Sequence, residues 1–225
     1  MRLKNSALGY QIQGLELDKE ETIDKKGSVT SFYKYDSLFS MNELFKSEKI
    51  QIESTSFTVS EPVSTYTIEP LIYKYALDNE KKILKEEYDI SEFYIEKIKL
   101  ERKFVDKIFA AEFYYERNMY DDVSKHLYDI SIMNKSDNIK KMLKNKQELT
   151  TLVRYKRKEE ELRIGGIESN KKIKDFHYMK LEFSDELIHA FNKMQRIYVL
   201  DDESMLTIDE VKNTIKVLLE IFNDL

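Results

Sequence analysis

The feature that most constrains the fold of this chain is a change in hydrophobic periodicity near Glu69. Before that point, residues 10–18 and 28–35 alternate apolar and polar side chains, which is the period-two pattern of half-buried β-strands. The polar residues 18–27 separate these two runs, so we expect a hairpin. Residues 50–59 are rich in β-branched side chains and predict a third strand.

Beyond Glu69, apolar residues recur at spacings of three and four, as on one face of an α-helix. Pro70 suits the first turn of a helix, and residues 93–98 predict one short strand within this part. The longer helices that we expect are a pair within residues 100–133 that turns near Asn118, with Asp121 or Asp122 as the cap of its second member, and segments over residues 138–164, 184–200 and 207–223.

The expected fold class is therefore α+β, with a partial β region over residues 1–65 and a larger helical domain over residues 66–225. Thr207 and Glu210 have the spacing of a capping box at the start of the last helix. Gly165 and Gly166 form the clearest break between helices.

Composition excludes several classes of protein. The net charge of −5 argues against a protein that coats nucleic acid by charge alone. The chain has no cysteine, and its three histidines lack the spacing of metal ligands. No window approaches 18 consecutive apolar residues and no apolar signal-peptide core is present, so we expect a cytoplasmic protein that does not enter a membrane.

Lys107 and Asp129 are the candidate functional residues of the helix pair. Each lies about 11 residues from the turn near Asn118, and at ~1.5 Å per residue these distances cancel in an antiparallel pair. The two side chains should therefore lie at the same height, either as a structural salt bridge or as a catalytic pair. We expect the neighbouring Lys125 and His126 to orient the carboxylate or to face solvent.

Two short motifs carry a resemblance to a known family. Residues 101–107 read E-R-K-F-V-D-K and residues 125–130 read K-H-L-Y-D-I. In residue type and separation these runs resemble the core of the AbiEii/AbiGii toxin family, which are nucleotidyltransferase-like proteins of abortive infection and toxin–antitoxin systems. The family's lysine and aspartate fall on Lys107 and Asp129. The resemblance covers most of the chain from about Tyr10 to Met133 and continues more loosely through the helical tail.

The resemblance implies transfer of a nucleotide from a nucleoside triphosphate to an acceptor such as tRNA. Two divalent metal ions, expected to be Mg²⁺, would align the triphosphate. Lys107 would stabilise charge on the phosphoryl oxygens, and Asp129 would position the lysine, the nucleotide or the acceptor. A cognate antitoxin is an implied partner. The alternative is a non-catalytic helical module, derived from the same family, that binds protein or RNA.

Two elements of the family are missing from the sequence. The family has a G-G-S or G-G-T turn that holds the triphosphate and a D-x-D pair that binds the metals, and neither occurs here. Glu53 is the only carboxylate on a suitable strand, and it is either a third metal-site acid or an outward-facing polar residue. We expect a form that is truncated at its N-terminus and inactive alone; a genuinely short protein that has lost catalysis is the alternative.

The most basic region comprises residues 154–158 and 171–174 together with Lys180. It predicts either contact with RNA phosphates or an ordinary solvated helix with i,i+4 ion pairs, because residues 159–161 are all glutamate.

Overall fold

The computed structural model describes residues 15–25, 28–36, 49–55, 62–163 and 165–223. Within them the fold is α+β, as expected: antiparallel β-sheets come first along the chain and a helical region follows. Residues 10–14 of the first predicted strand and residues 56–59 of the third lie outside the described residues.

The first sheet is a three-stranded antiparallel meander. Its strands are β1 (Glu16–Lys25), β2 (Ser28–Lys34) and β3 (Lys49–Thr55), in the order β1-β2-β3. The hairpin is confirmed, but the expected polar link is wrong, because most of that segment is β1 itself. β1 is an edge strand with mostly exposed side chains, so its polar residues remain in water and leave no alternating pattern.

Asp18 is a buried charged residue of this sheet. Its carboxylate lies 2.8 Å from the Lys34 ammonium and 3.0 Å from the Lys49 ammonium. These two lysines hold the pKa of Asp18 well below its usual range. Cross-strand ion pairs therefore replace an apolar contact at this position of the sheet.

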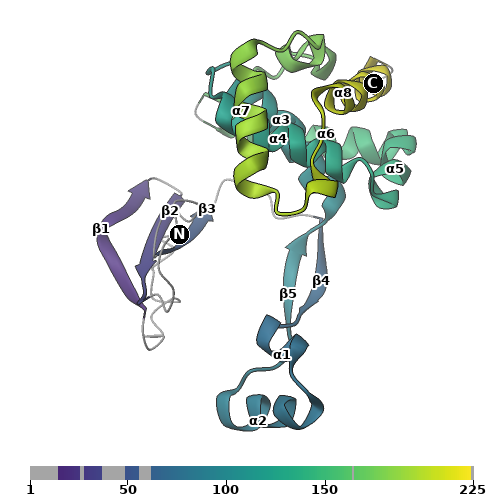
Figure 1. Cartoon of the computed structure of the whole chain (residues 1–225). Coiled ribbons are helices and arrows are strands. Elements are labelled where there is room, and N and C mark those ends of the chain that lie inside the picture. The colour runs from purple at the N-terminus through teal and green to yellow at the C-terminus, as the bar shows by residue number, and fades with distance from the viewer. Residues whose placement is uncertain (1–14, 26–27, 37–48, 56–61, 164, 224–225) are drawn as a thin grey trace.

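The second sheet is a two-stranded ribbon within a projecting arm. β4 (Val63–Ile68) pairs antiparallel with β5 (Phe93–Ile98), and α1 (Leu71–Tyr75) and α2 (Asp78–Tyr88) connect them. β5 confirms the short strand that the sequence predicted, whereas β4 was not predicted. We call residues 63–98 the arm; Figure 1 shows it extending away from the helices. The boundary expected at residues 65/66 falls inside β4, so the arm is better kept as one unit.

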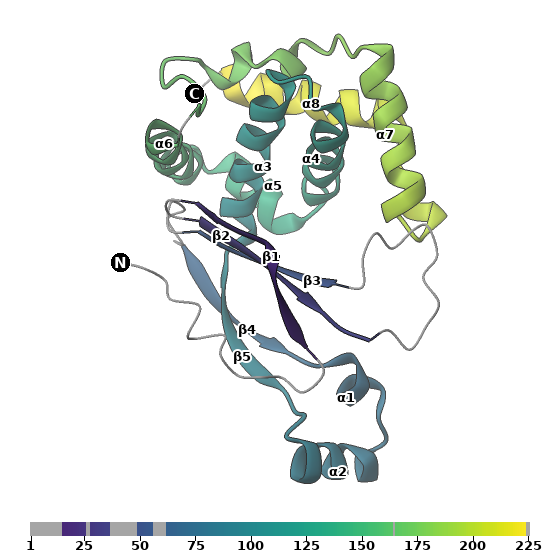
Figure 2. The ribbon, with the colours of Figure 1, turned by 90° about the vertical axis from the view of Figure 1, so that its left-hand side faces the viewer.

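The helical body follows the arm without a break. Its main helices are α3 (Leu100–Tyr115), α4 (Tyr120–Met133), α5 (Asp137–Lys144), α6 (Lys146–Leu162), α7 (Asp185–Tyr198) and α8 (Ile208–Asn223), with short 3-10 turns at η2 (Ile173–Asp175), η3 (His177–Lys180) and η4 (Asp202–Ser204). Figure 2 shows α3 and α4 side by side, with α7 alongside α4.

Two local features differ from the sequence expectation. The helix predicted over residues 138–164 is interrupted at Asn145, whose side chain accepts a hydrogen bond from the Glu148 N–H at 3.2 Å and begins α6. Neither Asp121 nor Asp122 caps α4; both lie in its first turn, after the N-cap residue Met119. Carboxylates in a first turn still favour the helix through its dipole.

Among the described residues, the hydrophobic core lies in the helical body. Every buried residue of its main cluster lies between Phe104 and Phe222. The predicted face of α8 is confirmed, since its buried residues are Val211, Ile215, Leu218 and Phe222. The expected break at Gly165–Gly166 is tight: a Cβ at Gly166 would lie 2.1 Å from the Glu160 carbonyl oxygen, so only glycine fits there.

Candidate functional site

Lys107 and Asp129 meet across α3 and α4. The Lys107 Nζ lies 2.6 Å from the Asp129 Oδ2, which confirms that the two side chains face each other. The turn between the helices spans residues 116–119, so both residues stand at the same height above it. Their side chains are 30% and 39% exposed, respectively, so another charged group has access to either one from solvent.

His126 adjoins this pair but does not orient it. Its ring stacks on the Tyr114 ring at a centroid distance of 5.3 Å, and its Nδ1 is buried without a hydrogen bond among the described residues. Burial, and secondarily the Lys107 ammonium, lower the pKa of His126 to about 4. The imidazole is therefore neutral at pH 7. Neither proposed role of His126, orienting the carboxylate or facing solvent, agrees with this position.

Lys125 faces solvent, which is one of the two positions expected for it, since 45% of its side chain is exposed. Its Nζ pairs with the Asp122 carboxylate at 3.1 Å, one turn earlier on the same helix, rather than with Asp129. The Lys107–Asp129 pair consequently has no second cation bound to its carboxylate within the described residues. As a partly exposed pair it can exchange partners with an incoming phosphate at small cost.

Glu53 is not part of this arrangement. It lies on β3 with an exposed side chain, and its Oε1 accepts a hydrogen bond from the Gln51 Nε2 of the same strand at 2.5 Å. In the described part of the chain no hydrogen bond or ion pair connects it to Lys107 or Asp129. The outward-facing reading of Glu53 agrees with this placement.

A second charged cluster was missed by the sequence analysis. The Lys171 Nζ lies 2.6 Å from the Glu112 Oε1, 2.7 Å from the Glu116 Oε1 and 3.3 Å from the His177 Nδ1. Glu112 is fully buried and also accepts a hydrogen bond from the His177 N–H at 2.7 Å. The Tyr115 ring, 5.8 Å away, stacks on the His177 ring.

Among the described residues, Glu112, Glu116 and His177 form the one group whose potential metal-ligand atoms all lie within 4.8 Å of one another. The Lys171 ammonium already occupies its centre and balances the carboxylates, so the cluster fits a structural tie between α3 and the 165–184 segment. The two glutamates on one face of α3 were visible in the sequence and predict a nearby cation. The sequence did not show which residue supplies that cation, since Lys171 lies more than 50 residues further along the chain.

The described residues therefore do not fit a two-metal centre beside Lys107. Paired carboxylates are absent from its surroundings, because Asp129 is bound by Lys107 itself and Glu53 belongs to another element. We derive no step that passes through a metal ion.

The basic region is divided between exposed side chains and side chains that make contacts within the protein. The exposed ones are Arg154, Lys158, Lys172 and Lys180. The Arg157 guanidinium is stacked over the Phe109 ring at 4.8 Å and donates hydrogen bonds to the Glu168 and Lys171 carbonyl oxygens. The Lys156 ammonium pairs with the Glu160 carboxylate at 2.7 Å, which is the i,i+4 pair that the glutamate run predicted. These contacts favour the prediction of an ordinary solvated helix with ion pairs over the prediction of contact with RNA.

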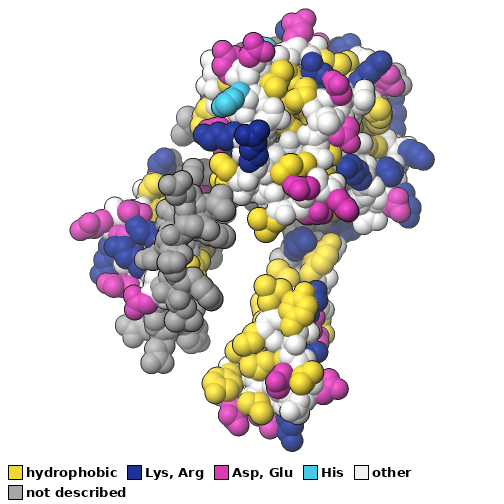
Figure 3. All heavy atoms as spheres, in the orientation of Figure 1, with side chains coloured by type: hydrophobic (Ala, Val, Ile, Leu, Met, Phe, Trp, Pro, Cys, Tyr) yellow, Lys and Arg dark blue, Asp and Glu magenta, His cyan; other side chains and the backbone are white. Residues whose placement is uncertain are grey.

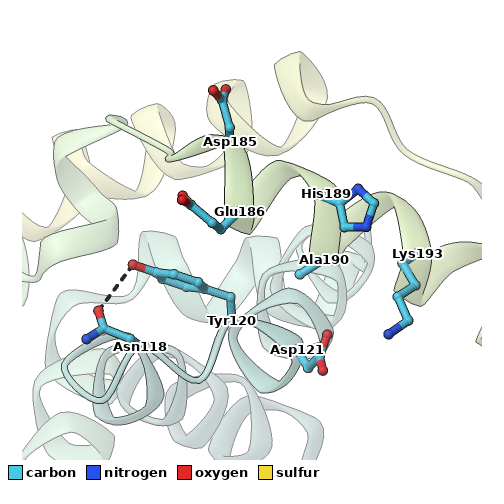
Figure 4. A pocket seen from close by; sticks show the side chains of 8 residues that line it. All are labelled: Asn118, Tyr120, Asp121, Asp185, Glu186, His189, Ala190 and Lys193. Atoms are coloured by element: carbon cyan, nitrogen blue, oxygen red, sulfur yellow. Dashed lines mark hydrogen bonds between the residues drawn. The ribbon is translucent and has the colours of Figure 1, made fainter.

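A solvent-open hollow lies between the start of α4 and α7. Figure 4 shows the Tyr120 hydroxyl donating to the Asn118 Oδ1, at 3.2 Å, beneath the acidic side chains of α7. The residues that line the hollow are Asn118, Tyr120, Asp121, Asp185, Glu186, His189, Ala190 and Lys193. Its charges are mixed and all lie near solvent, so it defines no ligand class.

Comparison of the chain with protein-family models, with curated proteins and with solved structures gives no match. Among the described residues, no helix is both long enough and apolar enough to cross a lipid bilayer.

Proposed function

We propose that this chain carries the phosphate-binding helix pair of an AbiEii-like nucleotidyltransferase. The observation that supports this proposal is the partly exposed Lys107–Asp129 pair at 2.6 Å. The two motifs that resemble the family place a lysine and an aspartate at these positions. The reaction would transfer a nucleotide from a triphosphate to an acceptor, for which tRNA is the family's expectation.

In this proposal Lys107 binds the triphosphate. Nucleotidyl transfer develops charge on phosphoryl oxygens, and a positioned ammonium stabilises that charge. Asp129 holds the ammonium in place until the phosphate displaces the carboxylate. The freed carboxylate is then within reach of an acceptor hydroxyl. The D-x-D pair and the glycine turn of the family are missing from the sequence, so the chain by itself should bind nucleotide without transferring it.

Titration of the chain with ATP tests the proposal. The Lys107→Ala variant should lose ATP binding, because the ammonium that contacts the phosphate is removed. The Asp129→Asn variant should bind ATP roughly tenfold more tightly, an effect of about 1.4 kcal/mol, because the ammonium no longer has a competing carboxylate. Lys103→Ala, one turn earlier on α3 and exposed, is the matched control and should bind like the parent chain.

A purely structural salt bridge gives the opposite pattern. Both variants would then lower the free energy of unfolding slightly while leaving ATP binding unchanged, and this result would overturn the proposal.

The second candidate is a non-catalytic helical module that binds RNA or a protein such as an antitoxin. It is favoured by the mutual neutralisation of Lys107 and Asp129 and by the lack of the family's D-x-D pair in the sequence. ATP titration separates the two candidates, since the module requires no nucleotide. Titration with tRNA then distinguishes RNA binding from protein binding.

A further inference from the structure

One end of the helical body presents a group of exposed lysines to solvent. Residues 137–146, which form α5 and the turn after it, contain four lysines and one aspartate, for a net charge of +3 in a chain of net charge −5. Figure 3 shows dark blue side chains over the end of the body at which Figure 1 labels α5. Lys140, Lys141 and Lys144 are exposed, and none of them forms an ion pair within the described residues.

The start of α3 adds two more exposed lysines beside α5. Lys99 and Lys103 precede Lys107 at intervals of four residues, so the three lie along one side of α3, about 6 Å apart. The Lys107–Asp129 contact fixes the register of α3 against the antiparallel α4. Four residues further on each helix, Lys103 is therefore level with Met133, where α4 ends and shortly before α5 begins. Figures 1 and 2 both show α5 beside the start of α3.

We call this group of exposed lysines the lysine surface; it comprises Lys99, Lys103, Lys140, Lys141 and Lys144. Two pairs within it, Lys99 with Lys103 and Lys140 with Lys144, are four residues apart, and like charges at that spacing weaken a helix. α6 has the opposite arrangement, since its Lys156 pairs with Glu160 at the same spacing. The lysine surface therefore fits a ligand that supplies the missing negative charges.

The exposed face of α5 does not suit a lipid bilayer. A helix that lies on a membrane inserts its apolar face among the lipids. The apolar residues of α5, which are Ile139, Met142 and Leu143, are buried in the core of the helical body. Only polar and charged side chains of α5 remain for an external ligand.

The composition of α5 does not suit a protein partner either. Protein interfaces are depleted in lysine, and aromatic or arginine side chains at their centre supply most of the binding energy. Residues 137–146 contain no aromatic residue and no arginine. The backbone of a nucleic acid carries a phosphate on every nucleotide and requires only ammonium groups within reach of those phosphates.

We propose that the lysine surface binds the sugar–phosphate backbone of a nucleic acid strand. Contacts to phosphate carry no sequence information, so binding should depend little on the base sequence. The local positive charge allows a chain of net charge −5 to bind a polyanion at one end of its helical body. Binding at this surface requires no nucleotide at Lys107.

Fluorescence anisotropy of a labelled single-stranded RNA, titrated with the chain, tests this surface. Replacing Lys140, Lys141 and Lys144 together with alanine should weaken binding roughly a hundredfold at ~0.1 M salt, because three phosphate contacts are lost. The slope of log K against log salt concentration should fall by about 2 in the same variant. The matched control removes the same charge from the arm, at Lys74, Lys82 and Lys85, and should bind like the parent chain. Alanine favours a helix, and circular dichroism establishes that both variants are folded.

Three results would overturn the proposal. The first is a parent chain that does not bind the RNA at low salt. The second is an equal loss of binding in the two triple variants, which would show that net charge alone controls the interaction. The third is sedimentation of the parent chain with phosphatidylserine vesicles that is lost in the α5 variant, which would assign the lysine surface to a membrane.

Lys103→Ala separates the lysine surface from the proposed nucleotide site. The loss of one phosphate contact should weaken RNA binding about fivefold at ~0.1 M salt, while ATP binding stays unchanged. A parent chain that binds RNA through this surface but does not bind ATP would reject the nucleotide site alone. A chain that binds ATP through Lys107 but does not bind RNA would reject the lysine surface alone.

Discussion

His126 illustrates how a partly buried imidazole connects stability to pH. Its ring lies between α3 and α4, stacked on Tyr114, and its pKa is lowered to about 4 by burial and by the Lys107 ammonium. In the unfolded chain the pKa returns to about 6.5. The unfolded state therefore binds more protons between these two pH values, and stability falls as the pH drops through that window.

Replacing His126 with phenylalanine should reduce this pH dependence. The aromatic ring preserves the contact with Tyr114 but cannot be protonated. Between pH 7 and pH 5 the parent chain should lose about 2 kcal/mol more of its unfolding free energy than the variant. Urea denaturation of both proteins at the two pH values measures this difference; identical losses would contradict it.

Lys171 supplies the cation that the buried Glu112 needs. Replacing it with methionine leaves that carboxylate and the nearby Glu116 without their ammonium partner. We expect a loss of about 3 kcal/mol of unfolding free energy, as when one member of a buried pair is removed. The exposed neighbour Lys172→Met is the control for urea denaturation and should change little. Similar values for both variants would show that the cluster contributes nothing to stability.

At the scale of elements, the capping box of α8 tests how far local sequence sets a helix start. The Thr207 N–H donates to the Glu210 Oε2 at 2.7 Å, and the Glu210 N–H donates to the Thr207 Oγ1 at 3.2 Å. This is the reciprocal arrangement that the sequence spacing predicted.

Thr207→Ala should lower the unfolding free energy by about 1 kcal/mol, because the Glu210 N–H loses its acceptor. Thr207→Ser retains a hydroxyl oxygen and should restore most of that stability. Thermal or urea unfolding of the two variants measures the effect. Equal stability of the Thr207→Ala and Thr207→Ser variants would show that the capping box contributes nothing to the free energy of unfolding.

For the whole molecule, the position of the core predicts an independently folding unit. All residues of the main hydrophobic cluster lie in the helical body, between Phe104 and Phe222. A chain limited to residues 99–225 should therefore keep its helices and unfold cooperatively, since no buried apolar contact of that cluster is removed. Circular dichroism during heating tests this expectation. A gradual, non-cooperative transition would mean that the β part completes the core.

Local sequence was sufficient wherever a segment has one buried face. The helix pair, α7 and α8 were predicted because apolar side chains on one face leave a period that can be read directly. β1 was recognised only over residues 16–18 and β4 was not recognised, since most of their side chains stay in water and their pairing alone makes them strands. The sequence also predicted that Lys107 and Asp129 lie at the same height, because both are about 11 residues from the turn near Asn118.

By itself, the sequence determined the α+β class, the helical faces and the meeting of Lys107 with Asp129, because each depends on spacing along one or two adjacent elements. Only the tertiary structure decided that Lys171 and His177 join Glu112, that His126 packs on Tyr114, and that α5 lies beside the start of α3. These features depend on which distant surfaces meet in space, and spacing along the chain carries no record of such contacts.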